Sequence, residues 1–440
     1  MLGLQIKVIQ SDEIVKQKVL VICPTRNDKT ELARPEISED NKIYFHEYPE
    51  DAFDRILASG YIHDFAKQNP QTIIDDLLEF CNKEAITGVM SSDDYPGSIY
   101  TSVIAQRQQL SGCLPEVILR CQHKFYSRQD QRKLVPLAAP LFCLVNQNSG
   151  KIESVPLPFP FFMKPVKSYF SYLAGKIHHE EHLLSKLQSK QIPKEFLYQF
   201  NWFLNKFGFA DISTEFLAEE ILYGHQVTVE GYVYNGQCII IGITDSIMYP
   251  NTISFARFEY PSFLPETVQQ RMGTIAQELM LGIGFNNSLF NIEMMYNPIT
   301  DHIFIIEVNS RMSRQFADLY EKVDGMSSYT IALAIATAQQ PHIKYRNGQF
   351  KVAASCVMRL FENKRVVTVP TVDDIAQVKK IFPESRVYIC VNEGELLSDQ
   401  LQDGNSYLYC IIHLGARDQQ ELQEKFEYAK RLLPFVFQAI

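Results

Sequence analysis

The stretch that most constrains this chain is residues 289–314, which has the pattern of a β-hairpin followed by a polar segment. Two apolar runs, residues 289–296 and 302–308, flank Asn-Pro-Ile-Thr-Asp, a short segment of turn-forming residues. Because successive side chains of a strand point to opposite faces, Glu307, Asn309 and Arg311 should share one face. The segment therefore predicts a hairpin with one charged face.

The acids of this hairpin predict a metal site. Glu293 and Glu307 lie equally far from residue 300, inside the turn, and should face each other. Two carboxylates roughly 5 Å apart repel each other unless a cation lies between them. Together with the amide of Asn309 they form an oxygen set suited to Mg²⁺ or Mn²⁺, and Arg311 could reach a phosphate on that metal. The alternative is an exposed acidic edge paired with nearby lysines.

Composition narrows the class of protein. At 440 residues the chain should form two or three domains. A net charge of -9 argues against a nucleic-acid groove. The nine cysteines form no C-x-x-C pair, no run of about 18 apolar residues is present, and the first residues lack a secretory pattern. We therefore expect a soluble cytoplasmic protein with reduced thiols that binds neither nucleic acids nor membranes.

The N-terminal part alternates short apolar strands with helices, which predicts a parallel, Rossmann-like sheet. The expected strands are residues 18–23, 43–48 and 86–92, and the expected helices are residues 72–83 and 98–109. No G-x-G-x-x-G follows the first strand, so the sequence gives little support to a dinucleotide site there. Residues 91–97 follow a strand and precede a helix. They form either a ligand loop or a polar turn with a helix cap.

Two further segments bear on the site and the fold. Residues 159–164 predict a buried strand that ends on Lys164, whose ammonium either meets an anion or extends to solvent. Asn235-Gly236 between alternating runs predicts a second hairpin within residues 227–245. From residue 351 onward, strands and a final amphipathic helix predict a small α+β lobe.

Taken together, these pieces resemble the ATP-grasp superfamily, in the branch of carboxylate-amine ligases and biotin carboxylases. The resemblance covers most of the chain from about residue 18. It implies an α/β and α+β multidomain protein: a Rossmann-like domain in residues 1–120, a two-lobed ATP-grasp clamp in residues 121–345 with a small mobile lobe at about 155–222, and a C-terminal α+β lobe in residues 346–440.

The resemblance also implies roles for individual residues, with ATP and Mg²⁺ or Mn²⁺ as cofactors. The phosphates would be approached by two lysines, adenine would meet the inter-lobe linker, and the ribose would lie near a polar side chain. In that order these are Lys124 and Lys164, then Glu219, Glu220 and Leu222, then Gln226. The metal ligands would be Glu293, Glu307 and Asn309, and Arg311 would contact phosphate or an acyl-phosphate.

Two departures from the family pattern matter. The segment Ser-Tyr-Phe-Ser at residues 168–171 carries hydroxyls where relatives often have a glycine-rich flap, although Ser171 occupies the usual serine position. Biotin carboxylases show E-x-N-x-R-x-Q-x-E, and this chain has Gln315 where the final glutamate would act as a base. A glutamine cannot take that proton, so the carboxylase interpretation is disfavoured.

We therefore expect an ADP-forming ligase that activates a small carboxylate, with an amino acid as the leading candidate, and joins it to an amine. Arg257 and Arg314 are the cations expected near the acceptor carboxylate. Two alternatives remain: a bicarbonate-activating enzyme similar to biotin carboxylase, and a nucleotide-binding module without catalysis. The oligomeric state stays open, with a homodimer as one option.

Overall fold

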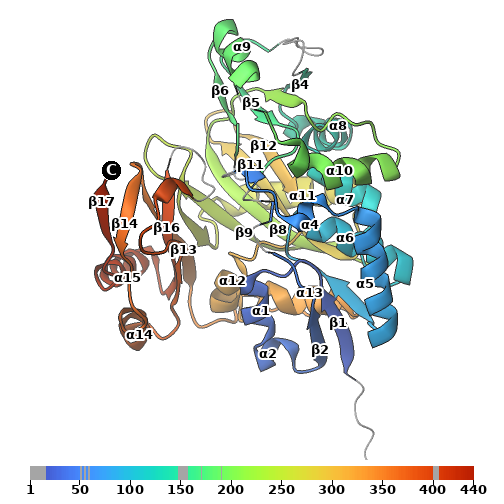
Figure 1. Ribbon diagram of the computed structural model, residues 1–440. Coiled ribbons are helices and arrows are strands. Elements are labelled where there is room, and N and C mark those ends of the chain that lie inside the picture. Colours follow the sequence, from blue (N-terminus) through green and yellow to red (C-terminus); the bar gives the residue numbers. More distant parts are fainter. Residues whose placement is uncertain are drawn as a thin grey trace, which may run out of the picture.

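The computed structural model describes residues 16–49, 52–53, 56–57, 60–146, 157–169, 171–189, 191–399 and 406–440. It has a central body, a small lobe at the top of Figure 1, and a C-terminal part on the left. Within the described part of the chain, no helix combines the length and the apolar character needed to cross a membrane.

The N-terminal sheet is parallel, as predicted, with strand order β2-β1-β3. Its strands are β1 (Gln17–Val21), β2 (Asn41–Phe45) and β3 (Gly88–Met90). The helices around it are α1 (Arg26–Leu32), α2 (Pro35–Ser38), α4 (Asp64–Lys67), α5 (Pro70–Glu84) and α6 (Gly97–Gln108). Helix α5 begins where Asn69 caps the Gln71 amide and proline occupies the first turn. The loop that follows β3 leaves the carboxyl edge of this sheet, where open α/β sheets bind ligands.

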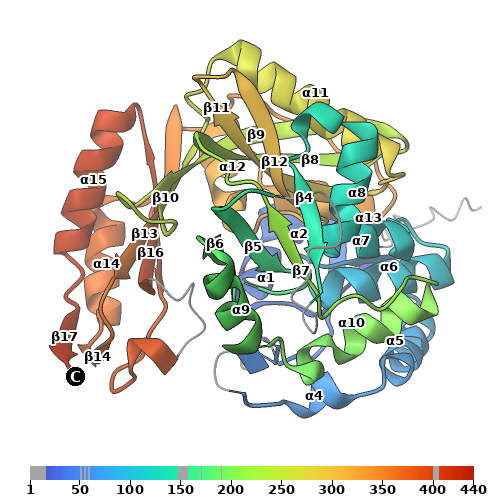
Figure 2. The ribbon, with the colours of Figure 1, turned by 90° about the horizontal axis from the view of Figure 1, so that it is seen from above.

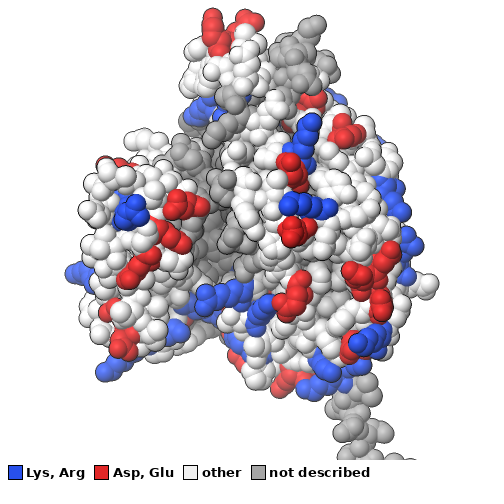
Figure 3. All heavy atoms as spheres, in the orientation of Figure 1, with Lys and Arg blue, Asp and Glu red and all other residues white. Residues whose placement is uncertain are grey.

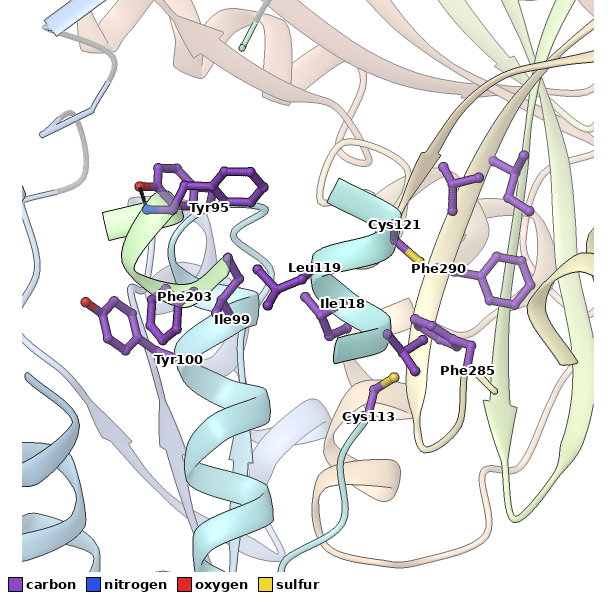
Figure 4. Close-up of a cluster of buried hydrophobic side chains, with 14 of the residues drawn as sticks. Tyr95, Ile99, Tyr100, Cys113, Ile118, Leu119, Cys121, Phe203, Phe285 and Phe290 are labelled. Atoms are coloured by element: carbon purple, nitrogen blue, oxygen red, sulfur yellow. Dashed lines mark hydrogen bonds between the residues drawn. The ribbon is translucent and has the colours of Figure 1, made fainter. Parts of the chain in front are cut away.

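Helix α7 (Pro115–Gln122) joins the N-terminal sheet to the rest of the body. Figure 4 shows Leu119 pointing toward Ile99 of α6, while Cys121 points toward Phe290. Leu119 and Phe290 are fully buried. Because α7 has apolar residues on two sides, it packs between both layers and fixes helix α8 (Lys124–Leu134), which follows it directly. The short 3₁₀ turn η1 (Pro136–Ala138) then leads into the small lobe.

The small lobe is an antiparallel sheet of order β4-β7-β5-β6 with two helices. It consists of β4 (Phe142–Val145), β5 (Phe161–Pro165), β6 (Gly175–Ile177), α9 (Glu180–Ser189), α10 (Lys194–Lys206) and β7 (Phe216–Glu219). Cys143, Phe161, Met163 and Phe216 form its core. The predicted strand that ends near Lys164 is therefore present as β5.

A single eight-stranded sheet runs through the body and the C-terminal part in the order β12-β11-β8-β9-β10-β13-β16-β15. Its strands are β8 (His225–Tyr234), β9 (Gln237–Met248), β10 (Phe255–Tyr260), β11 (Ser288–Asn297), β12 (His302–Asn309), β13 (Val352–Leu360), β15 (Arg386–Ile389) and β16 (Tyr407–Ala416). Both predicted hairpins are present, and Asn235 and Gly236 have φ values of 48° and 75°, as a type I′ turn requires. Helices α11 (Glu266–Gly282), α12 (Ala317–Asp324) and α13 (Ser328–Ala336) pack against the body.

The C-terminal part shares this sheet, because β10 pairs with β13 with Arg257 opposite Cys356. It adds α14 (Val372–Ile381), α15 (Gln419–Arg431), the turn η2 (Leu397–Asp399) and the pair β14 (Lys364–Thr368) and β17 (Val436–Ala439). Figure 2 shows α14 and α15 on the outer side of these strands. The predicted fold class is confirmed, whereas the domain boundaries at residues 120 and 345 stay predictions.

Surface charge is mixed on the face that Figure 3 shows. Lysines and arginines there are interspersed with aspartates and glutamates, and no continuous basic surface forms over this face. Eight of the nine cysteines are buried and all of them are free thiols.

Candidate functional site

The predicted metal ligands lie on the two adjacent strands β11 and β12 of the large sheet. Glu293 of β11 is the direct cross-strand partner of Glu307 of β12, and Asn291 is the partner of Asn309. The Asn309 amide donates to Asn291 Oδ1 at 2.9 Å, and the Asn291 amide donates to the Arg311 carbonyl at 3.1 Å. The two glutamates therefore face each other as the sequence predicted, in a register that a β-bulge shifts by one residue between Glu293 and Met294.

Both predicted lysines reach this hairpin. Lys124 is the first residue of α8, and its Nζ lies 2.8 Å from Glu307 Oε1. Lys164 of β5 has its Nζ 2.8 Å from Glu219 Oε2 and donates to the Ile306 carbonyl of β12 at 3.2 Å. The helix after α7 and the small lobe thus each place one cation over the same strand.

The two glutamates titrate in opposite directions. Burial and the neighbouring Glu307 raise the pKa of Glu293 to about 7. Burial also opposes ionisation of Glu307, but Lys124 and Lys164 outweigh it and lower the pKa of Glu307 to about 2. Without a cation between them, one carboxyl is ionised and the other tends to keep its proton. This is the behaviour of two paired acids whose charges a divalent cation would balance, so the set fits Mg²⁺ or Mn²⁺.

The proposed nucleotide residues occupy the junction between the small lobe and the body. The Glu220 amide donates to the Leu141 carbonyl at 3.0 Å, and Glu220 Oε1 accepts from the Leu141 amide at 2.7 Å. Leu222 is half-buried. The Gln226 amide donates to Glu293 Oε2 at 3.0 Å, which places this side chain beside the predicted metal ligands. The backbone of the linker is therefore held on one side by the start of the small lobe.

Glu219 differs from Glu220 and Leu222 of the linker in its burial and in its contacts. Its side chain is buried, forms an ion pair with Arg128 and accepts from Lys164. Arg128, which is 2% exposed, also donates to the Ile306 carbonyl at 2.7 Å. Glu219 therefore links α8 to β5, and both of its cationic partners also contact the Ile306 carbonyl of β12.

The segment without glycines nevertheless adopts a turn with unusual backbone angles. Ser171 is exposed with φ of 55°, and Leu173 has φ of 59°, both in the left-handed region that glycine adopts more readily. Phe170 lies outside the described residues. Lys167, just before this turn, is buried and contacts Asp94 of the loop after β3.

The predicted arginines have distinct surroundings. Arg311 Nε lies 3.9 Å from Asp94 Oδ1. Arg257 is ion-paired with Glu259 within β10. Burial and Asp28 raise the pKa of Tyr329 in α13, and the positive charge of Arg314 acts in the opposite direction. The geometry thus connects Arg311 to the N-terminal loop.

Sequence reasoning missed three charged residues of this region: Arg128, Lys167 and Asp94. Arg128 follows Lys124 by four residues on one helix, so both point to the same side, and that spacing could have indicated it. Asp94 lies within residues 91–97, which the sequence indicated as a possible ligand loop, but its contact with Lys167 arises only through tertiary packing.

Glu230 of β8 supports a prediction about pH. It is fully buried, Oε2 accepts from the Ser313 amide at 3.1 Å, and Oε1 has no hydrogen-bond partner in the described structure. Burial raises the pKa of Glu230 to about 8, against the opposing effects of Ser313 and Arg311. The folded state thus holds this proton more tightly than the unfolded state, and the contribution to stability falls as pH rises from about 4.5 to about 8.

Glu230→Gln should therefore remove this pH dependence. Between pH 5 and pH 8.5 the free energy of unfolding of the variant should therefore rise by about 4 kcal/mol relative to that of the wild type. Urea unfolding of both proteins at the two pH values measures this difference. Parallel pH profiles would contradict a neutral Glu230.

Comparison with known proteins agrees with this geometry. Residues 157–320 match a sequence model of the ATP-grasp domain. No curated protein matched the sequence. The fold is similar to that of an L-amino acid ligase from Bacillus licheniformis, with a TM-score of 0.73 and 15% identity over 96% of this chain and 99% of that one.

Two further solved structures extend the comparison. A phosphoribosylglycinamide synthetase from Anaerococcus prevotii has a TM-score of 0.64 and 13% identity over 96% of this chain and 100% of that one. A biotin carboxylase from Campylobacter jejuni has a TM-score of 0.62 and 12% identity over 97% of this chain and 93% of that one. Identities this low show a common fold. Residues 157–320 therefore match the ATP-grasp domain, and the chain shares the fold of these ligases over nearly its whole length.

Proposed function

We propose that the protein is an ADP-forming ligase that phosphorylates a small carboxylate with ATP and transfers the resulting acyl group to an amine. The observation that carries this proposal is the meeting of Lys124 with the paired acids Glu293 and Glu307 in an ATP-grasp domain, with Lys164 contacting the same strand. Phosphoryl transfer needs positioned cations and charge neutralisation more than covalent help from the protein.

Each residue has a defined task in this proposal. Glu293, Glu307 and Asn309 would hold Mg²⁺, which when bound neutralises phosphate charge. Lys124 and Lys164 hold the ATP phosphates from α8 and from the small lobe. Arg311 stabilises the oxyanion that develops on the attacked carbonyl. The backbone near Glu220 and Leu222 would contact adenine, with Gln226 near the ribose and Ser171 over the phosphates. Arg257 and Arg314 would face the acceptor carboxylate.

The choice of a carboxylate-amine ligase rests on the segment after β12 and on the similar structures. The amide of Gln315 donates to Ser355 Oγ at 2.8 Å, so an amide stands where a carboxylase would need a base. The structure with a TM-score of 0.73 is an L-amino acid ligase, which supports an amino acid as the acid substrate.

Release of ADP with a panel of acids tests the proposal. The panel should contain the twenty amino acids, simple aliphatic acids and bicarbonate, each with Mg²⁺-ATP and with hydroxylamine as a general amine. We expect ADP release that depends on one class of acid, accompanied by the corresponding hydroxamate. Release that depends on bicarbonate without hydroxamate would favour the carboxylase. Tight Mg²⁺-ATP binding without turnover on any acid would favour an inactive nucleotide-binding module.

A further inference from the structure

Lys167 is a buried lysine whose surroundings are mostly aromatic. Its side chain is 2% exposed, and its Nζ lies 4.8 Å from the ring centre of Tyr95, 5.1 Å from that of Phe200 and 5.7 Å from that of Tyr169. Rings at such distances attract a cation but do not replace the charge of an anion. Lys167 therefore depends on whichever carboxylate lies beside it.

That carboxylate is Asp94, which lies between two cations. Asp94 Oδ2 is 3.3 Å from Lys167 Nζ, and Asp94 Oδ1 is 3.9 Å from Arg311 Nε. Both distances exceed the roughly 2.7–2.9 Å of a tight charged hydrogen bond, whereas Lys124 and Glu307 approach to 2.8 Å. Asp94 is 23% exposed while Lys167 is 2% exposed. Asp94 is thus loosely held, and it is far more accessible than Lys167 and about as accessible as Arg311, which is 26% exposed.

The group lies where three parts of the chain meet. Asp94 belongs to the loop at the carboxyl edge of the N-terminal sheet, Lys167 follows β5 of the small lobe, and Arg311 follows β12. The charges of Asp94 and Glu307 both act on Lys124, and the charge of Lys167 acts on Glu307. Asp94, Lys167 and Arg311 therefore border the phosphate end of the proposed site.

An anion beside Lys167 favours its charged form. Burial lowers the pKa of Lys167, Asp94 opposes this, and the nearby charge of Lys124 adds to the lowering. Glu307 also acts on Lys167, but Asp94 is the carboxylate that contacts it, and removing the contacting counter-charge of a buried cation is strongly unfavourable. If the carboxylate of a bound molecule takes the place of Asp94, the net charge around Lys167 stays the same.

We propose that Lys167 and Arg311 form the binding seat for the carboxylate of the acid substrate, and that Asp94 fills this seat in the free protein until the substrate displaces it. The proposal rests on the proposed function for the identity of the occupant as a small carboxylate, which has the same charge and shape as the end of the Asp94 side chain. It assigns the direct contacts with this carboxylate to Lys167 and Arg311 in place of Arg257 and Arg314. The Gln122 Oε1, 3.2 Å from Lys167 Nζ, keeps the ammonium in place during the exchange.

Two substitutions with opposite expected signs test the proposal. Asp94→Asn removes the competing carboxylate, so the KM for the acid should fall about fivefold or more. Lys167→Met removes half of the seat, so the KM for the acid should rise about tenfold or more, with Lys167→Arg in between. The KM for ATP should change less than about twofold in all three. The control is Lys194→Met, at an exposed lysine of α10.

A purely structural ion pair would behave differently, because breaking it from either side would raise the KM for the acid. A higher KM in both Asp94→Asn and Lys167→Met would therefore overturn the proposal. If Lys167→Met does not fold, the comparison of Asp94→Asn with Lys167→Arg still decides between the two interpretations, since Asp94→Asn alone must lower the KM.

A binding measurement separates this inference from the proposed function. Acetate is the probe, and the readout is the rise in melting temperature that it causes without nucleotide. The rise should be larger in Asp94→Asn than in the wild type, because acetate then supplies the missing counter-charge, and smaller in Lys167→Arg. Equal rises in all three would overturn the inference. The expected rises together with no turnover on any acid would uphold the seat and reject the ligase activity.

Discussion

Glu307→Gln is expected to lower the kcat of acid-dependent ADP release by about 10²–10³-fold while leaving the fold intact. Glu307 faces Glu293 across the strands and lies 2.8 Å from Lys124. Glutamine preserves the size of the side chain and can still accept from the lysine. It removes the one charge of the pair that is fully ionised at neutral pH, since the pKa of Glu307 is about 2. A metal held by these acids should therefore bind weakly in the variant.

Steady-state ADP release at saturating ATP, measured over a range of Mg²⁺ concentrations, checks this prediction. The apparent Mg²⁺ requirement should rise together with the loss of kcat. The matched control is Glu278→Gln, an exposed acid of α11 that should behave as the wild type. Full turnover by a folded Glu307→Gln protein would remove Glu307 from the set of metal ligands.

Glu219→Gln should have the largest effect on stability, a loss of about 3–5 kcal/mol in the free energy of unfolding. Burial opposes ionisation of Glu219, yet the charges of Arg128 and Lys164 outweigh it and lower the pKa of Glu219. The side chains of Arg128, Lys164 and Glu219 are 2%, 9% and 6% exposed. Without the carboxylate, two buried cations share one neutral amide.

Urea unfolding at pH 7 measures this loss, and the neighbouring residue provides the control. Glu220→Gln keeps the oxygen that accepts from the Leu141 amide, and Glu220 is only half-buried, so its stability should change little. A similar small change in both variants would mean that the cations around Glu219 are compensated by other groups.

Much of the fold followed from local patterns. Equal distances from residue 300 predicted that Glu293 faces Glu307, and the structure has this pair. It is reached through a β-bulge, because Met294 pairs with Ile305 and the register shifts by one residue before Glu293. The parallel N-terminal sheet and the turn at Asn235 also followed from local composition. The pairing of β10 with β13 did not, because it joins segments about a hundred residues apart and no local pattern selects one exposed strand edge over another.

The candidate site also contains residues that the sequence indicated and residues that it did not. Lys124 and Lys164 were predicted through a family resemblance, and the structure places both beside the predicted hairpin, although their roles stay proposals. Lys167 gave no signal, since a lysine in a turn is ordinarily a solvated residue.

The sequence by itself determined that residues 289–309 form a hairpin, because strand and turn preferences are local properties of the backbone, whereas the β-bulge beside Glu293 appears only in the structure. Only the tertiary structure decided which charges meet. The N-terminal loop, the small lobe and the end of β12 bring Asp94, Lys167 and Arg311 together. Electrostatic contacts between distant segments depend on how whole layers pack, and that packing is set by the sum of many apolar contacts rather than by any one motif.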